Sequence, residues 1–380
     1  MDNSLALYFD DDAIYGAVQP FPGKFHAIPP DLSTAYALTF LVDHREIRYG
    51  KTFQAEVRQG DPRAIGDCWA WIAAGKTFVI GDYERARIEM LRPVLRDIRQ
   101  AYTQAMSAYD VETEGLVARQ LPVRALFSDN IPPALREQVL DFLQQEGMAV
   151  ARMPFDSLGA SLLAAQAANR QMGKAGSYAV IEALHDHINL SLFHWQEGAA
   201  PLRRHTASLF GYGVDPRAGV IAKMAVDDAN RQHRVLNDQA ALDQEYLRQM
   251  PNAIEWQQTL AQSPRPFRSF SLRLSADPNN EIAVTIDKRQ VDRLTSDRSQ
   301  HIHRLIENTF SPWQPKEQVL AWHLIGSNLI HSELLEKFQA YGQGRIFVWN
   351  DADAIKSGLL GLFGRQEGAP ARPHPAVPSE

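Results

Sequence analysis

Apolar residues along the chain form two kinds of pattern, short runs typical of buried strands and stretches with helical spacing. The first stretch, LALYFDDDAIYGAVQ, predicts two strands joined by an acidic turn at Asp10–Asp12. Residues 86–109 carry apolar residues at helical spacing, with Pro93 near the first turn. A strand, a helix, a strand and a helix are then predicted at 121–133, 134–148, 149–155 and 156–171. This alternation is typical of an α/β fold.

The second half of the chain opens with VIEALHDHINLSLF, which predicts two buried strands around a turn at Leu184–His187. Residues 217–262 are charged, Gln-rich and mostly helical in pattern. Two alternating segments, FRSFSLRLS and NEIAVTI, flank Asp277-Pro278-Asn279 and predict a hairpin. The last predicted elements are a helix at 288–309, a strand and helix around Gly326-Ser327, a strand at GRIFVW and a helix at NDADAIKSGLLGLF.

Length, composition and net charge limit the kinds of protein that this chain can be. The chain has 380 residues, 45% of them hydrophobic, which is enough for two domains. A formal net charge of −6 argues against a nucleic-acid partner. The single cysteine, Cys68, excludes a disulfide within the chain and is expected in the core. The N-terminus lacks the pattern of a signal peptide and no long apolar run suits a membrane span, so we expect a cytoplasmic protein.

The order and texture of these elements over residues 1–363 resemble the ATPase domain of DnaK-type heat-shock chaperones, within the actin-like superfamily. The resemblance implies an actin-like fold of two lobes, built from duplicated ribonuclease-H-like domains around a central cleft. The lobes would be 1–175 and 176–363, with a helical and hairpin subdomain inserted at about 217–290. The Pro-rich segment 364–380 has the composition of a disordered tail.

Both phosphate loops of that family are rewritten in this chain. The first reads Asp-Leu-Gly-Thr-Thr in the family; here Asp10 matches the Asp, and Asp12 replaces the Gly. The second, Asp-Leu-Gly-Gly-Gly-Thr, falls in ungapped register on Glu182–His187, where no glycine remains. Glycines let backbone N–H groups approach phosphate closely, and an added carboxylate near 4 Å repels it by about 1 to 4 kcal/mol. We therefore expect conventional Mg-ATP binding to be lost.

Two further motifs supply candidate residues for nucleotide binding or catalysis. Asp156 stands in register with a catalytic Glu of the family, and Gly326-Ser327 partly keeps its adenosine motif, Leu-Val-Gly-Gly-Ser-Thr. Each has a structural alternative, Asp156 as a helix N-cap and Gly326-Ser327 as a helix start. If nucleotide binds, the candidate ligands are Asp10, Asp12, His185, Gly326 and Ser327, and the candidate catalytic acids are Asp10, Asp156 and Glu182.

His185 and His187 raise the alternative of a divalent metal site. His185 and His187, facing Asp10 across the expected cleft, have the ligand types that suit Zn or Mn. The alternative, which we favour, is a hydrogen-bonded plug in place of nucleotide. The run Asp10–Asp12 also suits an ordinary solvated turn, because Asp favours turns in any protein.

We therefore expect a non-catalytic chaperone-ATPase-like protein, a pseudo-ATPase that binds another protein as an interaction or regulatory module. No cofactor is assigned to this function. ATP or ADP with Mg belongs to the first alternative, a divergent but active ATPase. The second alternative, from a different class, is an actin-like assembly or secretion-system component.

Overall fold

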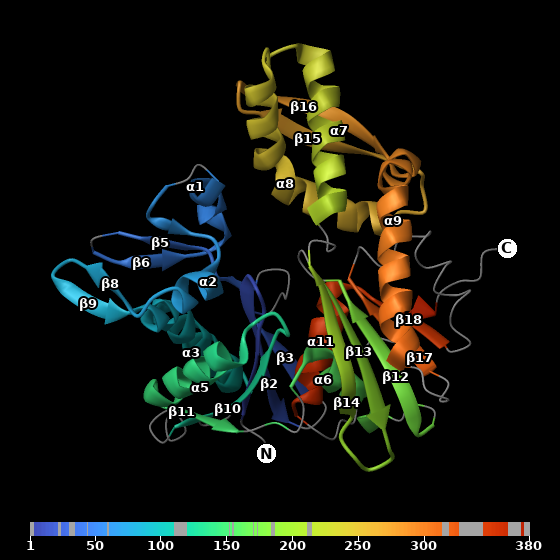
Figure 1. Ribbon diagram of the computed structural model, residues 1–380. Helices are drawn as coiled ribbons and strands as arrows, with labels where there is room; N and C mark the ends of the chain where they lie inside the picture. The colour runs from blue at the N-terminus through green and yellow to red at the C-terminus, as the bar shows by residue number, and fades with distance from the viewer. Residues whose placement is uncertain are drawn as a thin grey trace. The chain divides into compact units, whose positions relative to one another are not determined.

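A computed structural model of the chain (Figure 1) describes residues 4–21, 24–29, 35–43, 45–58, 61–109, 120–151, 153, 156–169, 171–172, 174–183, 187–210, 215–313, 319–326, 345–363 and 374–375. Contacts between Cα atoms divide the chain into two compact units. The first unit consists of Met1–Ala175, Trp195–Leu202 and Ala352–Arg372, and the second of Gly176–His194, Arg203–Asp351 and Pro373–Glu380.

The sheet of the first unit follows the order β11-β10-β1-β2-β3, with β4 also paired to β2. Its strands are β1 (Leu5–Phe9), β2 (Ala13–Phe21), β3 (Lys24–Ile28), β4 (Tyr36–Ala37), β10 (Leu121–Phe127) and β11 (Met148–Ala151). β1 runs antiparallel to β2 and parallel to β10, and β10 runs parallel to β11. Every residue of β1 is buried, as expected of a central strand covered on both faces. The predicted strand, acidic turn and strand at the N-terminus are confirmed.

Several helices of the first unit alternate with these strands along the chain. They are η3 (Arg87–Leu91), α3 (Arg92–Ser107), α5 (Pro133–Gln145) and α6 (Leu158–Ala168). One core joins Leu5 and Leu7 of β1 with Ile98 of α3 and Val139 of α5. Pro93 lies in the first turn of α3, where its missing N–H has no helical acceptor to lose. The helical spacing at 86–109 and 134–148 therefore predicted these two helices correctly, within a few residues at each end.

A group of small elements follows β4 in the first unit. It contains β5 (Phe40–Val42), β6 (Ile47–Tyr49), η2 (Lys51–Phe53), α1 (Gln54–Arg58), β7 (Ala64–Ile65), α2 (Cys68–Ala73), β8 (Thr77–Ile80) and β9 (Tyr83–Ala86). β5, β6 and β7 form a three-stranded sheet, and β8 and β9 form a hairpin. Cys68 is buried, with its Sγ 3.9 Å from Sδ of Met90, so the expected core position is confirmed.

The sheet of the second unit follows the order β14-β13-β12-β17-β18-β19. Its strands are β12 (Gly176–Glu182), β13 (His187–Trp195), β14 (Leu202–Phe210), β17 (Val319–Ile325), β18 (Arg345–Trp349) and β19 (His374–Pro375). β12 runs parallel to β17, and β17 runs parallel to β18. Of the predicted tail at 364–380, the part that the structure describes is β19, which pairs antiparallel with β18. Apart from β19, the two sheets have the same strand order. In each, the first three long strands of the unit lie in the order third, second, first (β3-β2-β1 and β14-β13-β12), and two parallel strands then extend the sheet (β10-β11 and β17-β18).

An insertion between β14 and β17 forms its own hydrophobic core in the second unit. It consists of α7 (Asp215–His233), α8 (Gln239–Gln262), β15 (Phe267–Leu274), β16 (Asp277–Asp287), α9 (Lys288–Phe310) and η4 (Ser311–Trp313). The predicted hairpin is confirmed, but its turn lies earlier than expected. Leu274 pairs with Asp277, so Ser275 and Ala276 form the turn, and Asp277-Pro278-Asn279 begins β16.

The last helix, α11 (Asp351–Gly361), belongs to the first unit from Ala352 onward. The sequence had placed all of 176–363 in one lobe. α11 meets α6 in the first unit because both helices carry small residues at the contact. The hydroxyl of Ser161 donates to the carbonyl of Gly358 at 2.6 Å, and a Cβ on Gly361 would lie 2.1 Å from the carbonyl oxygen of Ser161. Only glycine permits this approach.

Within the described ranges, no helix combines the length and the apolar composition needed to cross a bilayer.

Candidate functional site

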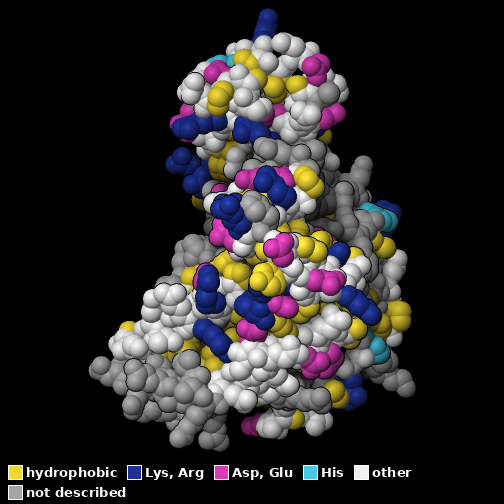
Figure 2. Space-filling model, turned by 90° about the vertical axis from the view of Figure 1, so that its left-hand side faces the viewer, with side chains coloured by type: hydrophobic (Ala, Val, Ile, Leu, Met, Phe, Trp, Pro, Cys, Tyr) yellow, Lys and Arg dark blue, Asp and Glu magenta, His cyan; other side chains and the backbone are white. Residues whose placement is uncertain are grey.

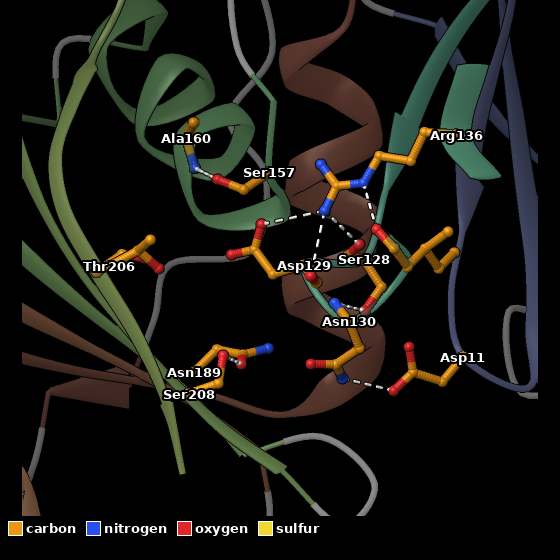
Figure 3. Close-up of polar contacts among 12 residues, drawn as sticks. Asp11, Ser128, Asp129, Asn130, Arg136, Ser157, Ala160, Asn189, Thr206 and Ser208 are labelled. Atoms are coloured by element: carbon orange, nitrogen blue, oxygen red, sulfur yellow. Dashed lines mark hydrogen bonds and ion pairs between the residues drawn. The ribbon is translucent and has the colours of Figure 1, made fainter. Parts of the chain in front are cut away.

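In the first unit, two loops meet at the carboxyl ends of neighbouring strands. Asp10–Asp12 follows β1, and Ser128–Asn130 follows β10; these strands are parallel and adjacent, so both loops lie at one edge of the sheet. The side-chain amide of Asn130 donates to Oδ2 of Asp11 at 2.6 Å (Figure 3). The backbone N–H of Ser128 donates to the carbonyl of Phe9 at 2.8 Å. The two loops are therefore fastened to each other.

Asp10 lies inside the protein and not in a solvated turn. Its residue exposure is 2%, and the hydroxyl of Tyr8 donates to its Oδ1 at 3.1 Å. The indole N–H of Trp69 donates to the Asp10 carbonyl at 2.8 Å. The expectation of a solvated acidic turn is thus wrong for Asp10, because an aromatic residue from α2 covers it. Asp12 is exposed, and its carbonyl accepts from the N–H of Leu38 at 2.7 Å.

Arg136 of α5 braces the loop after β10. Its Nε donates to the carbonyl of Ile131 at 2.7 Å, and its Nη2 donates to the carbonyls of Ser128 and Asp129 at 3.1 and 3.2 Å (Figure 3). The same Nη2 lies 3.8 Å from Oδ1 of Asp129, and both side chains are mostly buried. A planar guanidinium presents several donors in a fixed fork, so one side chain can hold three carbonyls at once.

The charge at this edge of the first sheet is mostly negative. Four carboxylates stand in the two loops, on Asp10, Asp11, Asp12 and Asp129, and the guanidinium of Arg136 contacts the second loop. Both the amide of Asn130 and the fork of Arg136 are directed at protein oxygens. These two side-chain donors therefore hold the loops in place and are not directed at a ligand.

Asp156 does not cap the helix that follows it. The N-cap of α6 is Ser157, whose hydroxyl accepts from the N–H of Ala160 at 3.2 Å (Figure 3). Asp156 itself is exposed, after the edge strand β11. The expectation that Asp156 caps this helix is therefore wrong, and the next residue in the chain does so.

In the second unit, the ends of β12 and β17 lie against each other. Glu182 is buried on β12, opposite Ile325 of β17, and the N–H of Ala183 donates to the Ile325 carbonyl at 2.7 Å. Gly326 has a φ of +110°, and a Cβ there would lie 2.1 Å from the carbonyl oxygen of Ala183. Packing of the two strand ends therefore explains this glycine without a ligand.

Polar side chains also lie on β13 and β14, the two neighbouring strands at one end of this sheet, and contact one another. The hydroxyl of Ser208 donates to Oδ1 of Asn189 at 2.7 Å, and the hydroxyls of Ser191 and Thr206 lie 3.3 Å apart (Figure 3). Asn189 and Ser191 are buried. These groups satisfy one another between β13 and β14, as buried polar groups must.

His323 is a histidine of the sheet interior. It lies on β17, stacks on Phe347 with ring centroids 5.0 Å apart, and its Nδ1 accepts from the indole N–H of Trp349 at 3.2 Å. Burial lowers the pKa of His323 to about 3. The ring is therefore neutral at physiological pH, and its role is structural.

Two sequence candidates, His185 and Ser327, lie outside the described residues, and the expected metal set of His185, His187 and Asp10 therefore lies partly outside them. His187 is half-buried at the start of β13. Among the residues that the structure places, no three His, Cys, Asp or Glu side chains gather as a metal-binding group. Asp10, Asp12 and Asp156 belong to the first unit, and Glu182, His187 and Gly326 belong to the second.

Sequence reasoning gave no role to Arg136 or to the amide of Asn130. Asn130 lies at the end of a predicted strand segment, and Arg136 is one polar position of a predicted helix. A basic residue one turn into the helix after a loop is a weak signal, because most such residues face solvent.

No protein-family model and no curated protein sequence matches the chain.

Proposed function

We propose that this chain is a degenerate relative of the DnaK-type chaperone ATPases, with their actin-like two-lobed fold, and that it acts without catalysis as a protein-interaction or regulatory module. One observation carries the proposal: the hydrogen bond of 2.6 Å between Asn130 and Asp11. It fastens together the two loops at the sheet edge where the family, by resemblance, holds phosphate.

The strand orders support the fold half of the proposal. Each unit has a sheet in which three strands consecutive in the chain are extended by two parallel strands. In each unit a long helix precedes the fourth of these strands: α3 precedes β10, and α9 precedes β17. A further helix follows the fifth strand, α6 after β11 and α11 after β18. Two copies of one element order are what duplicated ribonuclease-H-like domains require.

The residues at the sheet edge of the first unit do not fit Mg-ATP. Phosphate sites of this kind rely on free backbone N–H groups from glycine-rich turns. Here the turn carries Asp11 and Asp12, and the amide of Asn130 is directed at a carboxylate. In the second loop the chain has Leu184, His185 and Asp186 where the family has glycines. Each carboxylate near a phosphate oxygen costs about 1 to 4 kcal/mol, so the residues present disfavour nucleotide binding at this edge.

Exposed apolar side chains support the interaction half. Val79 and Tyr83 of the β8–β9 hairpin are 66% and 71% exposed. The face drawn in Figure 2 carries hydrophobic side chains among charged ones. Single exposed apolar residues are common, but two on one short hairpin are what a protein-binding element presents.

Isothermal titration of the full chain with Mg-ATP and with Mg-ADP tests the proposal. The expected result is no heat of binding at millimolar nucleotide. Micromolar binding together with Mg-dependent phosphate release, abolished by Asp10→Asn, would establish the divergent active ATPase instead. Light scattering with and without nucleotide separates the assembly alternative, since an actin-like assembly component grows in mass with concentration.

A further inference from the structure

Cationic side chains gather where the β15–β16 hairpin opens onto the first turns of α9. They are Arg265, Arg268, Lys288, Arg289 and Arg293, here called the basic cluster. Phe267 pairs with Asp287 across the hairpin, and the N–H of Lys288 donates to the carbonyl of Pro266 at 2.7 Å, so the two segments are joined. Arg289 and Arg293 are four residues apart on α9 and share a face. All five cations belong to the second unit of a chain whose net charge is −6.

The cluster is not neutralised locally. Within the part of the chain that the structure describes, none of its five side chains forms an ion pair or a hydrogen bond. The nearest carboxylates in sequence have other roles. Asp287 caps α9 by accepting from the N–H of Arg289 at 2.9 Å, and Asp292 pairs with Arg217 of α7. The result is an excess of positive charge around the single carboxylate of Asp287, on an acidic protein.

Two large apolar side chains that neighbour members of the cluster in sequence are exposed. Phe267 pairs with Asp287 and Arg268 with the buried Ile286, so the side chains of Phe267 and Arg268 lie on opposite faces of the hairpin. Phe267 is 58% exposed between Arg265 and Arg268, and Leu294 is 59% exposed beside Arg293. Cations alone would suit any anion, but cations with an exposed Phe and Leu suit a ligand that is both acidic and apolar. β15 also has a single strand partner, β16, among the described residues. The carbonyl of Arg273, near its far end, accepts from Arg248 and Gln249 of α8, so the edge that could take an extended segment is the stretch 267–271 beside the cluster.

We propose that the basic cluster, with Phe267 and Leu294, is the docking surface for an extended acidic segment of a partner protein that carries apolar side chains. Carboxylates of the partner pair with the cations, and its apolar side chains cover Phe267 and Leu294. Charge complementarity and the open edge of β15 favour a peptide over nucleic acid or lipid, whose phosphates need no strand edge. The proposal is independent of whether the chain binds nucleotide.

Fluorescence anisotropy at low ionic strength tests it, with a labelled peptide of about ten alternating Glu and Leu residues as the probe. The variant R289E/R293E removes two cations of the cluster. The control R96E/R231E changes the net charge equally at two arginines that are each 76% exposed. Arg217, near the start of α7, pairs with Asp292 beside the cluster, whereas Arg231 lies near the other end of α7, about 20 Å along the helix. The control therefore changes charge away from the cluster.

The expected result is saturable binding that R289E/R293E weakens at least about tenfold, while the control stays within about twofold. F267S/L294S is expected to weaken binding at every salt concentration, since it removes apolar contact and no charge. R289Q/R293Q repeats the test with a smaller change, and circular dichroism checks that each variant is folded. Equal weakening by both charge-reversal pairs, absence of peptide binding, or binding only to phosphatidylserine vesicles or single-stranded DNA would overturn the proposal.

Discussion

The side-chain amide of Asn130 donates to the carboxylate of Asp11 at 2.6 Å, although the two residues are 119 positions apart in the chain. They stand in the loops after β10 and β1, which are adjacent parallel strands. The bond stabilises the two loops by joining them. It also occupies the amide of Asn130 and one carboxylate oxygen of Asp11 at the sheet edge where a phosphate would be expected.

Asn130→Ala removes this bond and is expected to lower the stability of the first unit by about 1 to 3 kcal/mol, as for a hydrogen bond to a charged group. Urea unfolding followed by tryptophan fluorescence measures the change, since Trp69 contacts the Asp10 carbonyl in the same turn. Asn279→Ala, on the exposed start of β16, serves as the control and is expected to change little. An equal loss in both variants would contradict the assigned role of Asn130.

Arg136→Lys keeps the positive charge near Asp129 but loses the fork that holds three carbonyls. We expect it to lower stability by about 1 to 3 kcal/mol and to speed amide exchange at residues 129–131. Hydrogen exchange with mass spectrometry reads this segment directly. Arg96→Lys, at a side chain 76% exposed, is the matched control. If exchange at 129–131 stays unchanged in Arg136→Lys, the charge alone holds the loop.

Much of each sheet could be predicted because the deciding signals are local. β1 is a continuous apolar run, and α3 carries Val94, Leu95 and Ile98 at helical spacing, so period and burial agree. The β15–β16 hairpin was predicted from alternation. Its turn was misplaced because Pro278 and Asn279, both typical of turns, sit at the start of β16, where the strand is exposed and tolerates them.

The site was harder to predict because its decisive contacts are remote in sequence. Asp10 is buried by Trp69, which lies 59 residues away, and no local pattern distinguishes it from the exposed Asp12. The choice of Ser157 over Asp156 as N-cap depends on where the first turn of α6 begins, a difference of one residue. Gly326 looked like a remnant of a nucleoside motif, whereas the close approach of the Ala183 carbonyl accounts for it.

Gly326→Ala is expected to destabilise the second unit by about 2 to 4 kcal/mol, because it combines an unfavourable φ with a steric clash. The control is Gly198→Ala. Gly198 has a φ of +79°, but a Cβ there meets nothing within 4 Å. It should cost only about 1 kcal/mol, the price of the backbone conformation alone. Comparing the urea midpoints of the two variants separates conformation from contact, and equal midpoints would contradict the packing role of Gly326.

His323 makes the stability of the second unit depend on pH. Burial holds its pKa at about 3 in the folded protein, whereas an unfolded histidine titrates near 6.5. Between these values the unfolded chain binds a proton that the folded chain does not, so stability falls as the pH drops below about 6.5 and continues to fall toward 3.

His323→Asn removes the titrating group while keeping an oxygen that can accept from the indole N–H of Trp349. Thermal melts from pH 7 to pH 4 are expected to show a smaller decrease in Tm for this variant than for the natural chain. His301→Asn, at an exposed position on α9, is the matched control for the substitution itself. A neutral buried histidine resists protonation until the fold opens, so His323 should add to the decrease in Tm on acidification. Parallel slopes in the natural chain and His323→Asn would therefore mean that other groups govern the acid sensitivity.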